Sequence, residues 1–201
     1  RVNSLSIYEN LALLSGLSEL RELNLSSSAL FPAEHPPNSG LSELRNLRKL
    51  KVLELECWSN LADISALADL QALEVVDFER CAAVEDLSPL VALPELYCVG
   101  LSGCSNLRNL DALTRVPKLR SLSRFRLEGH ADLSGCHRLE TLEPLAQFPW
   151  IRELSLKHCQ ALTDLSPLAR LAELCDLSLE GCTGTASLSP LSGLSKLAKL
   201  N

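Results

Sequence analysis

Residues 73–94 read LEVVDFERCAAVEDLSPLVALP, and this stretch decides the fold. The spacing L-x-x-L-x-L-x-x-C-x-x-L is filled by Leu73, Val76, Phe78, Cys81 and Val84, and Leu87 and Leu90 follow it. The spacing returns after 23 residues at Leu96. Further copies begin at Leu50, Leu119, Ile151, Leu174 and Leu197. A fixed period of this length predicts a solenoid, because one repeat cannot bury its apolar edge alone and must stack on its neighbours.

Each repeat divides into an inner and an outer part. The L-x-x-L-x-L segment alternates, so it predicts a short strand with its leucines pointing inward. The outer part carries Ser-Pro-Leu at 88–90, 166–168 and 189–191. Serine is a favoured N-cap and proline is tolerated at the first helical position, so we expect one or two turns of helix there. The sequence predicts an α/β solenoid of about eight repeats, mostly of 23 residues. A parallel β-sheet should line its concave face, and short helical or 3₁₀ turns its convex face.

Five of the eight cysteines form a regular series. They are Cys81, Cys104, Cys136, Cys159 and Cys182, separated by 23, 32, 23 and 23 residues. Such a series marks one structural position, whose side chain points inward and bonds to backbone groups of an adjacent turn. Disulfides need side chains that face each other, whereas a ladder points them all the same way. We therefore expect reduced thiols and a cytoplasmic, reducing location. Cys57, Cys98 and Cys175 lie off the ladder, and no paired C-x-x-C zinc site is present.

The predicted domain organisation is a single array over residues 1–201, truncated at both ends, since the chain starts and stops within a repeat. Its first strand should lie at Leu5–Ile7, with Asn10 in the ladder position. A proline-rich insertion at 31–40 should project as a loop. In the repeat from Leu50 the ladder position falls on Trp58, whose ring must either be accommodated by a bulge or point outward.

A second insertion of nine residues, around Arg124 to Asp132, leaves two registers open. In the first, the chain runs through Leu119 and Leu122, makes an excursion, and returns at Leu133 before Cys136. In the second, Leu122, Phe125 and Leu127 form the strand, and the extra residues follow it. Either way the insertion interrupts the sheet. It is a tolerated surface loop or a specificity loop above the concave face.

The repeat resembles leucine-rich repeats over nearly the whole chain. Its outer segment, L-x-D-L-S-P-L-A-x-L, is similar to that of bacterial internalin repeats. The cysteine form, with Ser102-Gly103-Cys104 and Glu180-Gly181-Cys182, is similar to trypanosomatid leucine-rich repeat proteins of the adenylate-cyclase-regulator type. The first resemblance implies a surface adhesin and the second an intracellular interaction role. The motif is specific for the fold and much less so for function.

Composition and motifs exclude several classes of protein. The net charge of −6 disfavours nucleic acid, which demands a basic stripe. No stretch approaches 18 uninterrupted apolar residues, so we expect no membrane span, and no basic-then-apolar leader opens the chain. No G-x-S-x-G elbow, phosphate loop or H-E-x-x-H occurs, so we expect no catalytic residue, metal ligand or cofactor.

Acidic residues gather at the strand positions that should face the concave side. They are Glu22, Glu54, Glu56, Asp77, Glu79, Glu153, Asp176 and Glu180. Outside the ambiguous repeat only Lys157 and Lys199 oppose them. Neighbouring strands lie about 4.8 Å apart, so Glu54 should stand beside Asp77, and such like-charge pairs are unfavourable. The residues Cys98, Gly100 and Ser102 are small, and a partner could approach the backbone closely there.

The hypothesis that follows is a non-catalytic protein-interaction scaffold that binds a basic protein partner on its acidic concave face. The acidic positions could alternatively be only a solvated surface. Two other functions stay open: a regulatory or substrate-recruiting module of a larger enzyme, such as a ubiquitin ligase or cyclase assembly, and an extracellular adhesin.

Overall fold

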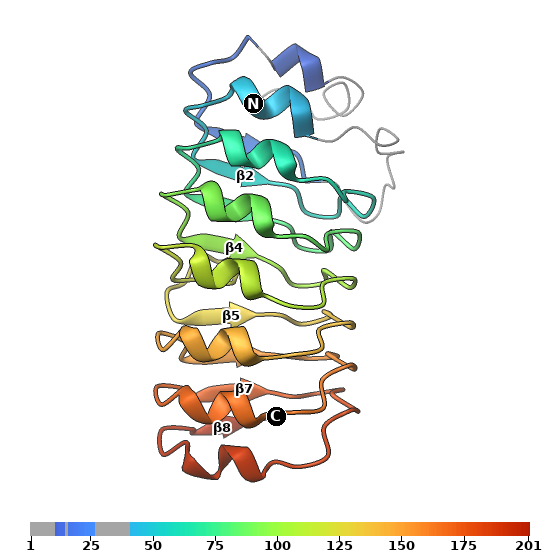
Figure 1. Ribbon diagram of the computed structural model, residues 1–201, viewed down its shortest axis with the longest axis vertical. Helices are drawn as coiled ribbons and strands as arrows, with labels where there is room; N and C mark the ends of the chain where they lie inside the picture. The colour runs from blue at the N-terminus through green and yellow to red at the C-terminus, as the bar shows by residue number, and fades with distance from the viewer. Residues whose placement is uncertain (1–10, 15, 27–40) are drawn as a thin grey trace.

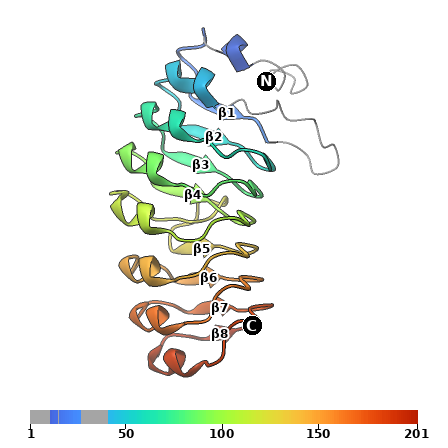
Figure 2. The ribbon, with the colours of Figure 1, turned by 45° about the vertical axis from the view of Figure 1, so that its right-hand side comes forward.

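The computed structural model describes residues 11–14, 16–26 and 41–201. The predicted strand at 5–7, its ladder residue Asn10 and the insertion at 31–40 lie outside the described residues. The repeats stack one on another in chain order, with strands along one side and short helices along the other (Figure 1). Seen from a second direction, the stack bends into a gentle arc with the strands on its inner side (Figure 2). The predicted α/β solenoid is confirmed.

The strands are short and parallel. They are β1 (Glu22–Asn24), β2 (Val52–Glu54), β3 (Val75–Asp77), β4 (Cys98–Gly100), β5 (His130–Asp132), β6 (Glu153–Ser155), β7 (Asp176–Ser178) and β8 (Lys199–Leu200). They form two four-stranded sheets, β1-β2-β3-β4 and β5-β6-β7-β8, each in chain order. Glu54 pairs with Asp77 across β2 and β3, as the repeat period predicts.

The outer segments are 3₁₀ helices. They are η2 (Leu11–Leu14), η3 (Leu41–Asn46), η4 (Ser65–Asp69), η5 (Ser88–Ala92), η6 (Asp111–Arg115), η7 (Glu143–Gln147), η8 (Ser166–Arg170) and η9 (Ser189–Gly193). The expected length is confirmed, but the expected serine cap is wrong. The N-cap residues of η5 and η8 are leucines without a side-chain cap. Aspartate two residues before each serine replaces that cap: Asp86 Oδ1 accepts the N–H of Ser88 at 2.8 Å, and Asp164 Oδ1 that of Ser166 at 2.8 Å.

The core is a column of stacked leucines between the sheet and the 3₁₀ helices. Leu55, Leu101 and Leu156 are fully buried in equivalent positions of their repeats, and Phe78 takes the same position in its own repeat. Burying one leucine side chain contributes about 1.5–3 kcal/mol relative to leaving it in water. A narrow core of this kind explains how so few aromatic residues suffice.

The cysteine ladder is confirmed as a set of inward-pointing hydrogen-bond donors. Each thiol donates to a carbonyl oxygen of the preceding turn. The pairs are Cys81 to Leu55 at 3.1 Å, Cys104 to Phe78 at 3.2 Å, Cys136 to Leu101 at 3.3 Å, Cys159 to Leu133 at 3.2 Å and Cys182 to Leu156 at 2.9 Å. Each of these carbonyl oxygens also accepts a backbone N–H within its own turn, so the thiol is its second donor and ties one turn to the next.

Trp58 occupies the ladder position of its repeat, and both expectations for it are wrong. Its ring is buried, with 3% of its surface exposed. Its Nε1 donates to the carbonyl oxygen of Leu25 at 2.6 Å, the same kind of bond that the ladder thiols make. The preceding residue Cys57 has φ 68°, and Arg80, before the next ladder residue, has φ 60°. The turn therefore has the ordinary form of this array, and no additional bulge is needed.

The repeat that begins at Leu119 follows the first of the two registers. Leu119 and Leu122 are buried, and the chain returns to the sheet at β5, ahead of Cys136. The second register would make Phe125 and Leu127 core residues, but 59% and 57% of their surfaces are exposed. The extra residues therefore lie between two neighbouring rows of the sheet, which only isolated bridges connect.

Thiol labelling of the native protein tests the burial of the cysteine ladder. Cys57 and Cys175 are half-buried, whereas the other six cysteines are buried. Burial raises the pKa of the ladder thiols, that of Cys81 to about 12, and so removes the reactive thiolate. We expect N-ethylmaleimide to modify Cys57 and Cys175 at least about tenfold faster than the other six. All eight should react alike in denaturant, and rapid native labelling of Cys104 would contradict the packing described.

Candidate functional site: a concave face crossed by the insertion

Four carboxylates of neighbouring repeats stand together on the concave face, and we call them the acidic cluster. They belong to Glu54, Glu56, Asp77 and Glu79. Alternation along the strands places them there, because the residues between them, Leu53, Leu55, Val76 and Phe78, are buried in the core. The sequence prediction brought these four residues together correctly.

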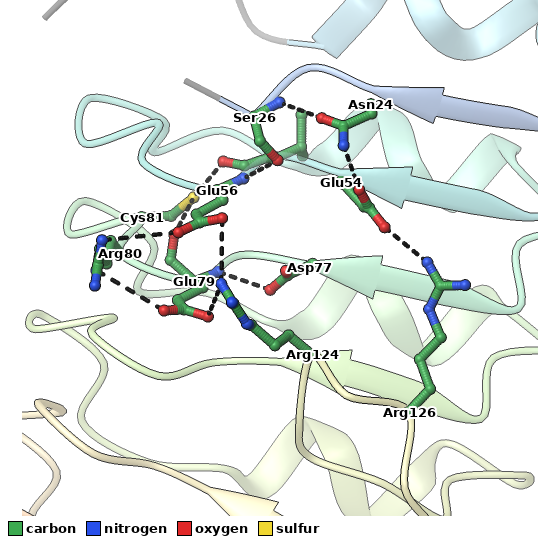
Figure 3. A network of polar contacts seen from close by, with 11 residues as sticks. Asn24, Ser26, Glu54, Glu56, Asp77, Glu79, Arg80, Cys81, Arg124 and Arg126 are labelled. Atoms are coloured by element: carbon green, nitrogen blue, oxygen red, sulfur yellow. Dashed lines mark hydrogen bonds and ion pairs between the residues drawn. The ribbon is translucent and has the colours of Figure 1, made fainter. Parts of the chain in front are cut away.

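We call residues 123–129 the strap. From it the side chains of Arg124 and Arg126 reach toward the carboxylates of this cluster (Figure 3). Arg124 lies between two carboxylates, with Nη1 at 3.0 Å from Glu79 Oε2 and 3.3 Å from Glu56 Oε2. Arg126 Nη2 lies at 2.7 Å from Glu54 Oε1. The insertion thus places two guanidinium groups against carboxylates of two rows that lie far earlier in the chain.

The strap connects two neighbouring rows of the sheet over the concave side, opposite to the side used by the other connections. The other connections between described strands include a 3₁₀ helix on the convex side. The strap joins Leu122 to β5 over the opposite face while advancing in the same direction along the array. Its hand is therefore the reverse of theirs, and right-handed connections dominate parallel sheets. Such a path needs stabilising contacts on the concave side, and the two arginines supply them.

Further contacts complete the charge balance of the cluster. Arg80 lies within 3.7 Å of Glu56 and 3.8 Å of Glu79. The amide of Asn24 donates to Glu54. Three arginines therefore face four carboxylates, which offsets most of the repulsion expected from like charges on adjacent strands. The Glu79 side chain is the least accessible of the glutamates in these ion pairs, with 13% of its surface exposed.

The strap covers the middle of the concave face. Val75, Cys98 and Gly100 occupy concave positions, yet all three are buried. The Cys98 thiol donates to the carbonyl oxygen of Ser123 in the strap at 3.2 Å. The expectation that a partner could approach the backbone at Cys98 and Gly100 is therefore wrong, because the chain's own insertion occupies that space. Ser102, further along, stays half-buried.

Asp77 is the one buried carboxylate of the acidic cluster, with 7% of its surface exposed. Burial raises its pKa to about 6, and the nearby carboxylates of Glu79 and Glu56 add to this. Two contacts act in the other direction: the Glu79 N–H donates to Asp77 Oδ1 at 2.9 Å, and Arg124 lies nearby. The space beside Asp77 is filled, since a Cβ added at Gly100 would lie 2.1 Å from Asp77 Oδ1.

The outward side of the strap carries two large apolar side chains. Phe125 and Leu127 alternate with the two arginines and are exposed. The guanidinium of Arg124 lies 5.1 Å from the centroid of the Phe125 ring. The alternation therefore directs charge toward the sheet and apolar surface toward solvent.

The second half of the concave face is open. Two of its predicted acidic residues pair with lysines, since Asp176 lies 2.8 Å from Lys199 and Glu180 lies 2.9 Å from Lys157. Glu153 lies 3.8 Å from the His130 ring. A shallow hollow of about 270 Å³ lies among these side chains. The structure does not bring these three acidic residues into the acidic cluster.

Glu22 is exposed on β1, next to Val52 in the neighbouring strand. It lies one row before the acidic cluster, and no ion pair involves it within the described part of the chain. Sequence reasoning missed Arg124, Arg126 and Asp132 as residues of this face. The alternation of arginine with apolar residues in Arg124-Phe125-Arg126-Leu127 was the available signal for the first two.

Other kinds of site are not evident in the described ranges. Among residues 11–14, 16–26 and 41–201, no group of His, Cys, Asp or Glu could hold a metal ion. None of the helices found there has the length and apolar character to cross a membrane.

Comparison with known proteins identifies related folds. No protein-family model and no curated protein matches the sequence. Among solved structures, internalin C2 from Listeria monocytogenes matches with a TM-score of 0.61 and 26% identity, over 94% of this chain and 73% of that one. The leucine-rich repeat domain of the type III effector XopL matches with a TM-score of 0.60 and 20% identity, over 95% and 71% of the two chains. The second likeness concerns the fold alone.

Proposed function

We propose that this chain, a leucine-rich repeat protein with repeats resembling those of internalins, is a non-catalytic scaffold. It binds a basic protein partner on its concave face. The fold supports protein interaction in general, because such solenoids present an extended concave surface for binding. The basic partner is the finer part of the proposal. Regulation of a larger enzyme and surface adhesion stay alternative predictions.

One observation carries the preference for a basic partner. Carboxylates on the concave face already bind guanidinium groups, because Arg124 and Arg126 contact Glu54, Glu56 and Glu79. The face is thus complementary to arginine in charge and in spacing. The open half also carries exposed acidic side chains, Glu153 on β6 and Glu180 after β7, which lie beside His130 and Lys157.

A reducing intracellular location is part of the same proposal. The ladder thiols donate to backbone carbonyls of preceding turns, and such bonds require the reduced form. Six of the eight cysteines are buried: the five thiols of the ladder and Cys98.

The test uses the open half of the face, because substitutions in the acidic cluster would also disturb the strap. The concave variant E153K/D176K/E180K reverses three acidic residues. The control E85K/E95K/E173K makes the same change in net charge away from the concave face, where Glu95 and Glu173 also pair with lysines. Both variants and the unaltered chain are used for affinity purification from native lysate, with partners quantified by mass spectrometry.

We expect a partner with a basic surface to be retained by the unaltered chain and the control, and to be reduced at least about tenfold with the concave variant. A partner bound equally by all three chains would contradict the proposal. If that partner is lost from F125S/L127S instead, the binding surface is the outward side of the strap.

A further inference from the structure

The strap is a basic segment of this chain that lies on the same face that we propose for a basic partner. We propose that the strap is an internal occupant of the acidic cluster, and that a partner segment bearing two arginines one residue apart binds there by displacing it. The inference rests on the proposed function, since it assigns a regulated site to the same face.

The contacts define the chemistry of the ligand. Arg124 and Arg126 are separated by one residue and reach carboxylates on two adjacent rows. A single guanidinium bridges Glu56 and Glu79, at 3.3 and 3.0 Å. A planar guanidinium with several donors is suited to such bridging, whereas the ammonium of lysine is a point charge. The site should therefore prefer an Arg-x-Arg segment to a Lys-x-Lys segment.

Hydrogen bonds anchor the two ends of the strap at Ser123 and Gly129. The part between them is held to the face mainly by charge and can therefore be exchanged. Its two large apolar side chains, Phe125 and Leu127, point away from the sheet and contribute little to the core. The side chains of Arg124 and Arg126 are 40% and 39% exposed, so salt weakens their ion pairs. A competing arginine segment can make the same contacts in their place.

Displacement has a thermodynamic consequence. A ligand for a site that is open only part of the time binds with an affinity reduced by the open fraction. Because the strap is tethered at both ends, it acts at the high effective concentration of an intramolecular ligand. The strap should therefore raise the apparent Kd of any external arginine segment.

Cys98 reports whether the strap is closed. Its thiol is fully buried and bonds to Ser123 in the strap. The rate of its modification by N-ethylmaleimide is measured by mass spectrometry in the unaltered chain and in R124A/R126A. The control R108A/R138A removes two arginines of the outer loops, where Arg108 pairs with Glu140. We expect modification of Cys98 to be at least about tenfold faster in R124A/R126A only. An unchanged rate would overturn the inference, because the arginines would then not hold the strap closed.

Competition is measured with a synthetic peptide of sequence Ser-Arg-Phe-Arg-Leu-Glu, which copies residues 123–128. Backbone amide shifts of Glu54, Glu56 and Glu79 report binding by NMR, with a lysine-for-arginine peptide as the control. We expect the arginine peptide to bind R124A/R126A at least about tenfold more tightly than the unaltered chain. Adding E54Q/E56Q/E79Q to that variant should abolish binding.

Two other outcomes separate the two proposals. Equal affinity for R124A/R126A and the unaltered chain, lost with the glutamine substitutions, would overturn the role of the strap and leave the basic-partner proposal standing. Absence of peptide binding to R124A/R126A, with Cys98 labelling faster, would show that the vacated cluster does not accept arginine segments. That result would overturn this inference and remove the main support for a basic partner.

Discussion

Replacement of Phe78 by alanine is expected to lower the free energy of unfolding by about 3–5 kcal/mol, the usual result of deleting a buried aromatic ring. Phe78 is the largest of the fully buried side chains in the part of the chain that the structure describes. It stacks in the core column between Leu55 and Leu101, which hold the equivalent positions of adjacent repeats. Its carbonyl oxygen also accepts the hydrogen bond of the Cys104 thiol at 3.2 Å. A cavity at this point therefore disturbs packing in three consecutive repeats.

The array itself offers the control for this experiment. Phe78→Leu introduces the residue found at the same position above and below, so we expect a loss of less than about 1.5 kcal/mol. Both variants are compared with the unaltered chain by equilibrium unfolding in urea. Equal losses for the two variants would mean that the ring fills no space that leucine leaves empty, contrary to the packing described.

Replacement of Asp77 by asparagine is expected to stabilise the protein at pH 7 by up to about 3 kcal/mol. The pKa of Asp77 is raised from 3.8 to about 6 in the folded chain, chiefly by burial. The folded state therefore binds this proton more tightly than the unfolded state does. It follows that stability decreases as the pH rises from about 4 to about 6. Asparagine removes the buried charge and keeps an oxygen to accept the Glu79 N–H, which lies 2.9 Å from Asp77 Oδ1.

The difference between D77N and the unaltered chain should disappear near pH 4, where Asp77 is largely protonated. Urea unfolding at pH 4, 5, 6 and 7 measures it. D164N is the control, and its effect on stability should have the opposite sign, because hydrogen bonding to Ser166 lowers the pKa of the exposed Asp164 carboxyl. Its effect should be destabilising at pH 7 and should fade as the pH falls through the lowered pKa of Asp164. A D77N effect that is independent of pH would contradict burial of the charged group.

The features that the sequence predicted all follow from the 23-residue period. Periodic leucines placed the strands and the core, and periodic cysteines placed the ladder, because each such residue meets its equivalent in the next repeat. The same period predicted that Glu54 lies beside Asp77. These contacts depend only on position within the repeat, so a single sequence suffices to find them.

The contacts that escaped prediction are those without a periodic equivalent. Arg126 and Glu54 are separated by 72 residues, and nothing in the repeat pattern links an insertion to a particular earlier row. Trp58 was misjudged because its size suggested strain, although its indole N–H can replace the ladder thiol as a donor. The serine caps were misjudged for a local reason: the side chain two residues earlier accepts the serine N–H, an aspartate before Ser88 and Ser166 and a serine before Ser189.

The interruption between β4 and β5 has a consequence for cooperativity. Continuous strand pairing transmits stability from repeat to repeat, but between the two sheets this pairing is reduced to the isolated bridges Cys98–Ser121 and Leu122–Ala131. The strap leaves this junction, and its ion pairs reach back to Glu54 of β2 and to Glu56 and Glu79, which lie two residues beyond β2 and β3, so they strengthen the first sheet alone. Strand pairing is therefore weakest at β5, and we expect the repeats from there onward to open as a separate foldon while the first four strands stay paired.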